Sequence, residues 1–284
     1  MRLSIGARLF EGPGPFLMGI VNTTPDSFSD GGRFLDPAAA VERALRLADE
    51  GADLVDVGGE STRPGAPAVP AEEELRRVIP VVERLRARSF PVPISVDTTK
   101  GAVARAALAA GADLVNDVSG LSDPDLGRAV AEARTPLVLM HTRGTPADMQ
   151  ARAVYADVAA EVAAELRGAL ARAVQAGVDP GAVILDPGIG FAKTADQSVE
   201  LLARIGELRA LGRPLLVGPS RKSFIGKLTG ASVHDRLPGT LAAVAACTLA
   251  GVEFLRVHDV AAARQAALVA AALRDFGAAR TGPR

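Results

Sequence analysis

Apolar runs of six or seven residues alternate with longer segments of helical periodicity along almost the whole chain. Eight runs occur, each followed by one segment rich in Ala, Leu, Glu and Arg. The first run begins near residue 16 and the last near residue 253, which gives a mean spacing of about 34 residues. This alternation is typical of βα units, in which a helix carries the chain back to a parallel strand.

The expected strands cover residues 16–22, 53–59, 93–98, 113–119, 137–142, 183–188, 215–220 and 253–259. The expected helices cover residues 37–50, 71–88, 101–110, 125–133, 154–176, 198–208, 239–250 and 261–276. Eight such units without a break in composition predict an α/β fold, a single (β/α)8 TIM barrel forming one domain over residues 1–284. An open doubly wound sheet is the alternative. It would usually carry a Gly-rich phosphate motif after its first strand, where this chain has "NTTPDSF".

The overall charge argues against several classes of partner. The formal net charge is −1, so nothing in the balance points to nucleic acid or to an acidic membrane surface. The apolar runs are too short or too interrupted to span a bilayer, and the N-terminus lacks the pattern of a signal peptide. The single cysteine, Cys247, excludes an internal disulfide and is expected to be a buried thiol. We therefore expect a cytoplasmic protein.

Rare residue types gather at the ends of the expected strands. The 32 basic residues include only four Lys, and the chain has two Asn and three His, a bias that fits either a GC-rich genome or heat tolerance. The rare residues at strand ends are Asn22, Asn116, His141, His258, Lys100, Lys193 and Lys222, and the carboxylates there are Asp56, Asp97, Asp117, Asp186 and Asp259. Because the C-terminal ends of barrel strands share one rim, this rim is the expected site.

Some of these carboxylates have a simpler explanation, since Asp at a strand end often caps the next helix. That alternative stays open for Asp117 and Asp259. It fits less well for Asp97, Asn116 and Asp186, which lie inside apolar runs and need a strong partner to offset their loss of water. A carboxylate can accept two parallel hydrogen bonds, an amide can donate and accept, and Lys222 and Arg256 can contact a ring. A flat, nitrogen-rich heterocycle suits this set, as do many other ligands.

Eight motifs, one after each strand, resemble those of the dihydropteroate synthases. They read "GIVNTTPDSFSDGG", "VDVGGESTRPGA", "ISVDTTK", "DLVNDVSG", "LMHTRGTP", "ILDPGIGFAK", "GPSRKSFIG" and "RVHDV", and they span residues 19 to 260. The resemblance implies the same barrel and the condensation of dihydropterin-CH2-pyrophosphate with p-aminobenzoate. It also implies Mg2+ as cofactor, inhibition by sulfonamides and a homodimer, which we expect to form through late helices such as 239–250.

The resemblance also assigns roles to individual residues. The expected catalytic residues are Asp97, Lys222 and Arg63, and the expected pterin-binding residues are Asp97, Asn116, Asp186, Lys222, Arg256, Met140 and Phe191. The expected pyrophosphate-binding residues are Asn22, Thr62, Arg63, Arg256 and His258, with Asn22 also holding the metal. The expected p-aminobenzoate contacts are Ser220, Lys222, Phe28 and Pro64. The loops after the first two strands are expected to close over bound pyrophosphate, with p-aminobenzoate binding second.

Two other functions are weighed against this one. Pterin-dependent methyltransferases share the barrel and the Asp and Asn residues at the pterin edge, but they do not need the "TPDSFSDGG" and "GESTRPG" loops. A non-catalytic pterin-binding protein would be expected to have lost Asn22, Arg63 or His258, and all three are present. Ile189, Thr142 and Pro219 depart from the family's common residues, but none of these changes removes a donor or a charge.

Overall fold

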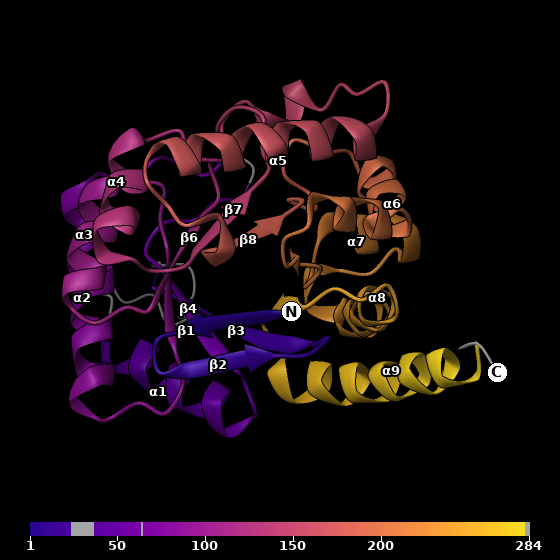
Figure 1. The fold of residues 1–284 in the computed structure, drawn as a ribbon, viewed down its shortest axis with the longest axis horizontal. Coiled ribbons are helices and arrows are strands. Elements are labelled where there is room, and N and C mark those ends of the chain that lie inside the picture. The colour runs from indigo at the N-terminus through magenta and orange to yellow at the C-terminus, as the bar shows by residue number, and fades with distance from the viewer. Residues whose placement is uncertain (24–36, 64, 282–284) are drawn as a thin grey trace.

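A parallel barrel forms the centre of the computed structural model, which describes residues 1–23, 37–63 and 65–281 (Figure 1). Its strands are β3 (Phe16–Asn22), β4 (Leu54–Gly58), β5 (Ile94–Asp97), β6 (Leu114–Asp117), β7 (Leu137–Met140), β8 (Val183–Asp186), β9 (Leu216–Val217) and β10 (Phe254–Val257). The strands are hydrogen-bonded in the order β8-β7-β6-β5-β4-β3-β10-β9. A parallel bridge between Leu185 and Leu215 joins the two ends of this order and closes the barrel.

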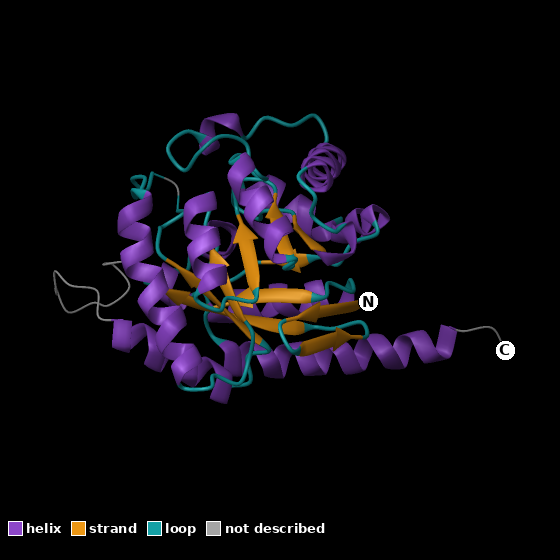
Figure 2. Cartoon of the chain, turned by 60° about the vertical axis from the view of Figure 1, so that its left-hand side comes forward, coloured by secondary structure: helices purple, strands orange, loops and turns teal. Residues whose placement is uncertain are grey.

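The helices surround the strands on the outside, as Figure 2 shows. They are α1 (Pro37–Asp49), α2 (Ala71–Ala87), α3 (Gly101–Ala109), α4 (Pro124–Ala133), α5 (Val158–Gln175), α6 (Ala195–Ala203), α7 (Ser223–Thr229), α8 (Leu237–Leu249) and α9 (Val260–Thr281). The predicted (β/α)8 fold is therefore confirmed. None of the described helices is both long enough and apolar enough to cross a bilayer.

Several expected helix boundaries were wrong, including the end of the helix expected over residues 261–276, which runs to Thr281. The helix expected over residues 154–176 begins at Val158, where the Asp157 side chain accepts a hydrogen bond from the backbone of Ala160. The helix expected over 198–208 begins at Ala195 behind a capping box of Thr194 and Gln197, and it gives way to a 3-10 turn after Ala203. The short helix α7 was not expected. The caps of α5 and α6 are formed by polar residues, so a search for apolar periodicity alone does not detect them.

Side chains alternate between the two faces of each barrel strand. Outward residues such as Val55 and Val115 pack against the helices in the larger core cluster. Inward residues at the N-terminal end of the barrel form a second cluster that includes Met18, Leu54, Leu114, Val138, Ile184, Leu216 and Phe254. The period of two along a strand places polar residues above this apolar layer, toward the C-terminal ends.

An N-terminal hairpin covers the apolar end of the barrel. Its strands, β1 (Arg2–Ile5) and β2 (Arg8–Glu11), pair antiparallel, and it was not expected from the sequence. The inner apolar cluster includes Leu3, Ile5 and Phe10 of the hairpin. The centroid of the Phe10 ring lies 5.0 Å from that of the Phe16 ring and 5.6 Å from that of the Phe254 ring. The hairpin thus closes one end of the barrel, and the site must lie at the other.

The hairpin should contribute directly to stability. We expect Phe10→Leu to lower the free energy of unfolding by about 1.5 kcal/mol, because it removes ring contacts from a side chain that is 1% exposed. Urea unfolding followed by circular dichroism measures this loss. The neighbouring Leu9 is 45% exposed, so Leu9→Ala should change stability by less than about 0.5 kcal/mol. Equal effects of the two variants would show that the hairpin is not packed as described.

Candidate active site

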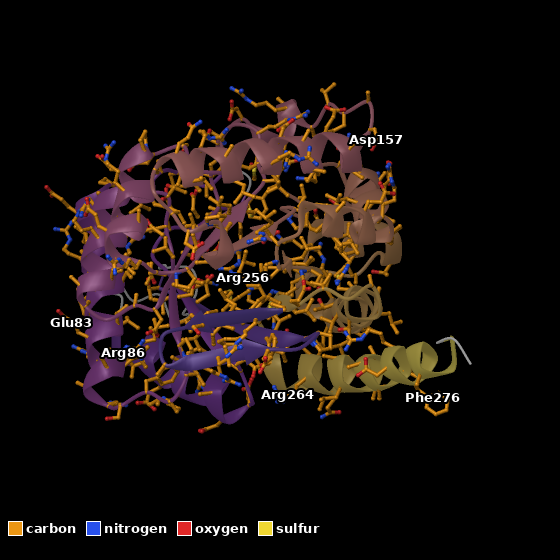
Figure 3. The ribbon with its side chains drawn as sticks, viewed as in Figure 1. Glu83, Arg86, Asp157, Arg256, Arg264 and Phe276 are labelled. Carbon is orange, nitrogen blue, oxygen red and sulfur yellow. The ribbon has the colours of Figure 1, made fainter. Side chains whose placement is uncertain are left out.

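A buried ionic network lies at the centre of the barrel mouth. Asp56, at the middle of β4, is fully buried and accepts hydrogen bonds from Ser95 Oγ (2.6 Å), Asn116 Nδ2 (2.9 Å) and Arg256 Nε (2.6 Å). The same guanidinium donates to Asp97 Oδ2 at 2.8 Å. Figure 3 places Arg256 near the middle of the barrel. Arg256, predicted to cover a ring face, is therefore held in position by two carboxylates.

Three polar groups beside this network lack the partners that buried groups normally have. The Oδ1 atom of Asn116 is buried and has no hydrogen-bond partner in the described part of the chain. The Asp186 carboxylate, in a residue 5% exposed, accepts a single hydrogen bond from the described residues, from Gly188 N at 2.7 Å. The Lys222 ammonium lies 4.1 Å from the centroid of the Phe191 ring and has no hydrogen bond to any described residue. An acceptor, a carboxylate and a donor are thus left open to a ligand.

Burial shifts the ionisation of these groups. It raises the pKa of Asp186 to about 6, against the opposing effects of the Gly188 N–H and of the cations Lys222 and Arg256. It lowers the pKa of Lys222 to about 8, although Asp186 opposes this change. Burial also raises the pKa of Asp97, while Arg256 acts to lower it. Because the pKa of Asp186 is raised on folding, its ionised form reduces the stability of the free chain as the pH rises through about 6.

The remaining inward side chains form the rest of the mouth. Met140 is buried on β7, opposite Asp186 of β8 in the strand register, and Phe191 is half-buried in the loop that follows β8. These positions suit the apolar walls predicted for them. Lys222 is the N-cap residue of α7, so the start of that helix positions its side chain.

His258 lies at the rim, just before α9. Its Nδ1 atom is 2.9 Å from Ser220 Oγ. Burial and the neighbouring guanidinium of Arg256 lower the pKa of His258 to about 3, so its ring is neutral at physiological pH. The first turn of α9 begins at Val260, and free N–H groups at a helix start favour anions. Ser220, predicted to contact p-aminobenzoate, is paired with His258 in the free chain.

Ion pairs and a backbone hydrogen bond anchor the loop after β4. Lys100 bridges the carboxylates of Glu60 and Glu74. Farther along, Gly65 N donates to Pro146 O at 2.8 Å. Thr62 is half-buried and Arg63 is exposed. The predicted contacts Phe28 and Pro64 lie outside the described residues.

The side chains at the barrel mouth limit the kind of metal site that the chain can form. The described residues contain no group of three or more His, Cys, Asp or Glu side chains that could hold a metal ion. Asn22, at the end of β3, is half-buried and makes no side-chain hydrogen bond to a described residue. Mg2+ usually keeps several waters and is bound by one or two protein oxygens plus substrate phosphates. The donors present therefore fit a magnesium ion that arrives with a diphosphate, and they do not form a preformed protein cage.

Several residues have structural roles. Asp117 faces outward and accepts hydrogen bonds from the backbone of Ser119 and Leu121 in the loop before α4. The N-cap of α4 is Asp123, so Asp117 stabilises the loop and does not cap the helix. Asp259 pairs with Arg221 at 2.7 Å. The Cys247 thiol is buried as expected, and burial raises its pKa to about 12.

The sequence reasoning missed two features of the site. Asp56 is one of the carboxylates at strand ends but has no predicted role, and Lys193 stands out in the sequence only by the rarity of its residue type. For Asp56 the signal was available, because "DLVDVGG" embeds the carboxylate between apolar residues, as "ISVDTTK" does for Asp97.

The barrel and its mouth, which presents a carboxylate, an amide and two cations together, suit a pterin-binding enzyme. A family model described as pterin binding enzyme matches residues 18–258. The chain belongs to this family and, within it, to the dihydropteroate synthases.

One relative found by sequence and two solved structures support this assignment. The dihydropteroate synthase of Synechocystis sp. is 47% identical over 274 residues, which cover 95% of this chain and 94% of the relative. The Xanthomonas albilineans dihydropteroate synthase with 4-aminobenzoic acid is 49% identical, with a TM-score of 0.89 and 99% of each chain covered. The same enzyme in complex with 7,8-dihydropteroate is 46% identical, with a TM-score of 0.86 and 100% of each chain covered.

Proposed function

We propose that the chain condenses (7,8-dihydropterin-6-yl)methyl diphosphate with p-aminobenzoate to give 7,8-dihydropteroate and pyrophosphate in folate biosynthesis. The observation that carries this proposal is the open set of buried polar groups at the barrel mouth, Asp186 and Asn116 Oδ1. The relatives solved with 4-aminobenzoic acid and with 7,8-dihydropteroate support the choice of substrates.

The pterin is bound by its polar edge. Its 2-amino group and adjacent ring N–H donate to the Asp186 carboxylate in two parallel hydrogen bonds. Another ring N–H donates to Asn116 Oδ1, and the Lys222 ammonium donates to a ring oxygen or nitrogen. Arg256 keeps its contacts to Asp56 and Asp97 and presents its guanidinium to the ring face.

The reaction begins with loss of the diphosphate. The bond between the CH2 carbon and its oxygen breaks, and the electron pair leaves with pyrophosphate, which Thr62, Arg63, His258 and the start of α9 bind. When bound, Mg2+ supplies further neutralisation of that leaving group, and Asn22 is the residue that would hold it. The nearby Asp97 carboxylate stabilises positive charge on the CH2.

The second substrate then attacks. The aniline nitrogen of p-aminobenzoate forms the new C–N bond and releases its proton to solvent. Ser220 and Lys222 are proposed to bind its carboxylate side, together with Phe28 and Pro64. The aniline is a weak nucleophile, so the cationic character of the carbon provides the driving force and no strong general base is required.

A direct assay tests the proposed reaction. The chain is mixed with the dihydropterin diphosphate, p-aminobenzoate and Mg2+, and released pyrophosphate is measured together with dihydropteroate. We expect release to require both organic substrates and a sulfonamide to compete with p-aminobenzoate. Pterin binding without release would instead favour a non-catalytic pterin-binding protein or a methyltransferase. Tight p-aminobenzoate binding without pyrophosphate would contradict the proposed binding order.

Pterin affinity should depend on pH through Asp186. We expect the affinity for 6-hydroxymethylpterin to fall as the pH drops below about 6, because the protonated carboxyl can no longer accept two hydrogen bonds. The limiting slope is about tenfold per pH unit. Isothermal titration calorimetry between pH 5 and 7 measures this change. In Asp186→Asn the step should vanish, and its persistence would assign it to another group.

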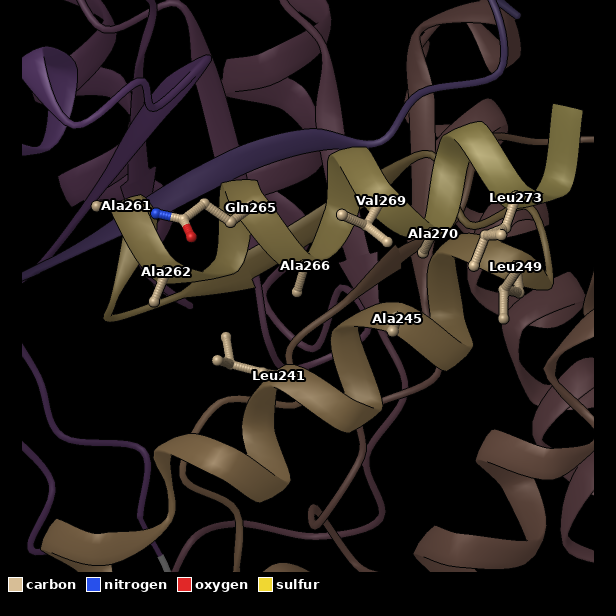
Figure 4. Close-up of a pocket in the computed structure, with 10 residues that line it drawn as sticks. All are labelled: Leu241, Ala245, Leu249, Ala261, Ala262, Gln265, Ala266, Val269, Ala270 and Leu273. Carbon is tan, nitrogen blue, oxygen red and sulfur yellow. The ribbon is translucent and has the colours of Figure 1, made fainter. Parts of the chain in front are cut away.

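We further propose that the chain, as one domain over residues 1–284, forms a homodimer through α8 and α9. A hollow of about 650 Å³ lies between these helices and is lined mainly by apolar side chains, as Figure 4 shows. Large apolar residues nearby are exposed on both helices, namely Leu249, Leu268, Val269, Leu273 and Phe276. Such a contiguous patch is typical of an interaction surface, and a second copy would cover it. A cytoplasmic location stays a prediction.

The dimer proposal predicts the effect of charge on this face. The double variant Val269→Glu/Leu273→Glu should be monomeric in sedimentation velocity, because paired copies would bury the added carboxylates. Val154 is 74% exposed and lies in the segment before α5, outside α8 and α9, so Val154→Glu should leave the oligomeric state unchanged. A wild-type chain that sediments as a monomer would contradict the proposal.

A further inference from the structure

The Lys193 ammonium is buried behind the loop that follows β8, and the proposed reaction does not use it. This side chain belongs to a residue only 2% exposed. Its Nζ atom lies 2.9 Å from His141 Nδ1, 3.1 Å from Gly188 O and 3.0 Å from Phe191 O. An ammonium has three protons and no acceptor, so these three neighbours use its full capacity.

The His141 ring is held in the form that this arrangement needs. Its Nε2 atom lies 3.0 Å from Glu165 Oε2, and Glu165 is itself paired with Arg143. A carboxylate accepts hydrogen bonds, so Nε2 carries the ring proton and Nδ1 accepts from Lys193. Burial lowers the pKa of His141 to about 4, which keeps the ring neutral.

The two carbonyls bound by Lys193 belong to the turn that carries the pterin contacts. Gly188 N donates to Asp186 Oδ1 at 2.7 Å, and the ring of Phe191 lies against Lys222. The turn lies directly against His141, the residue that follows β7. A Cβ at Gly188, which has φ +67°, would overlap the His141 carbonyl oxygen. The backbone of His141 also donates to Asp186 O at 2.8 Å. Two residues that Lys193 contacts therefore also hydrogen-bond to Asp186. Gly188 donates to its side chain, and His141 donates to its backbone carbonyl.

We propose that Lys193 is a positioning residue for pterin recognition: its three hydrogen bonds fix the turn at residues 188–191, whose Gly188 N–H donates to the Asp186 carboxylate. This inference rests on the proposed pterin site. Lys193 would act through Asp186 and Phe191 without touching the ring.

The charged groups around Asp186 and Lys193 determine how loss of the Lys193 ammonium would change the protonation of Asp186. Asp186 is faced by Lys193, by Lys222 at the start of α7 and by Arg256 on β10. Lys193 is faced by Asp186, by His141 at the end of β7, by Glu165 on α5, and by the cations Lys222 and Arg143. Burial lowers the pKa of Lys193 to about 7, so the ammonium is charged below that pH. Loss of one of three cations should make Asp186 easier to protonate.

The test compares Lys193→Met with the wild-type chain in calorimetric titrations of 6-hydroxymethylpterin from about pH 5 to about pH 8. Met fills similar space but has neither charge nor donor. At pH 6.5 we expect affinity to fall about tenfold, and the pH midpoint of binding to rise by about one unit. The ligand is the same throughout, so its own titration cancels in the comparison. The control is Lys227→Met, since Lys227 is 59% exposed and pairs with Asp196, and this variant should change neither quantity.

The outcomes separate this inference from the proposed function. A wild-type chain that does not bind the pterin would overturn the function itself. Wild-type binding with an unchanged midpoint in Lys193→Met would overturn only the role of Lys193, even if the melting temperature fell. If Lys193→Met does not fold, Lys193→Gln takes its place, because it keeps a donor without the charge and should raise the midpoint in the same way. Failure of both variants to fold would show that Lys193 serves only the fold, which also contradicts the proposal.

Discussion

Replacing Asp186 by Ala is expected to weaken pterin binding by about 10²- to 10⁴-fold. Two charge-assisted hydrogen bonds are lost, each contributing about 1.5–3 kcal/mol. The free chain should be no less stable at pH 8. Among the residues that the structure describes, the carboxylate accepts only the Gly188 N–H, and burial raises its pKa to about 6, so its ionised form opposes folding above that pH. Calorimetric titration with 6-hydroxymethylpterin and chemical denaturation measure the two effects.

Asp117 offers a matched control, since it is also a buried carboxylate at the end of a strand. It faces outward and accepts from the backbone of Ser119 and Leu121. We expect Asp117→Ala to lower the free energy of unfolding by about 1–3 kcal/mol and to leave pterin affinity unchanged. The two variants should therefore show opposite patterns. An Asp186→Ala chain that binds pterin within fivefold of the wild type would contradict the assignment.

Replacing Arg256 by Met is expected to lower the free energy of unfolding by about 3–5 kcal/mol and to abolish synthase activity. The substitution leaves the Asp56 carboxylate, which is fully buried, without its cation, and uncompensated buried charges are costly. Asp97 loses the same partner. Urea denaturation measures the stability, and pyrophosphate release measures the activity.

Two further variants separate charge from packing. Arg264 is 41% exposed and lies 3.4 Å from Asp53, so Arg264→Met should cost less than about 1 kcal/mol (Figure 3). Adding Asp56→Asn to Arg256→Met removes the unpaired charge and should recover part of the stability without restoring activity. No recovery in this double variant would mean that the loss arises from packing, which would contradict the role assigned to the unpaired charge.

Much of the architecture was predictable because it repeats. All eight barrel strands lie where the apolar runs placed them, since strand position follows from a local pattern. Asp186 and Asn116 also stood out locally, because a polar residue inside an apolar run needs a partner. That argument predicted a rim of polar groups at the C-terminal ends of the strands, and the structure places them there.

What could not be predicted depends on contacts distant in sequence. The hairpin of β1 and β2 precedes the repeat, and its apolar residues are recognisable as core only once the barrel end they cover is known. Asp56 and Arg256 are 200 residues apart, and their pairing depends on how the barrel closes. The Lys193 contacts likewise join the ends of two strands, so the rarity of Lys could mark the residue without revealing its partners.

The most direct measurement is a crystal structure of the chain with a bound pterin. The account predicts one ring at the C-terminal mouth of the barrel, with its amino group and adjacent N–H on the Asp186 carboxylate and an N–H on Asn116 Oδ1. Lys222 should donate to the ring, and Arg256 should remain on Asp56. A ring bound elsewhere, or one at the mouth that leaves Asp186 and Asn116 without contact, would contradict the central claim.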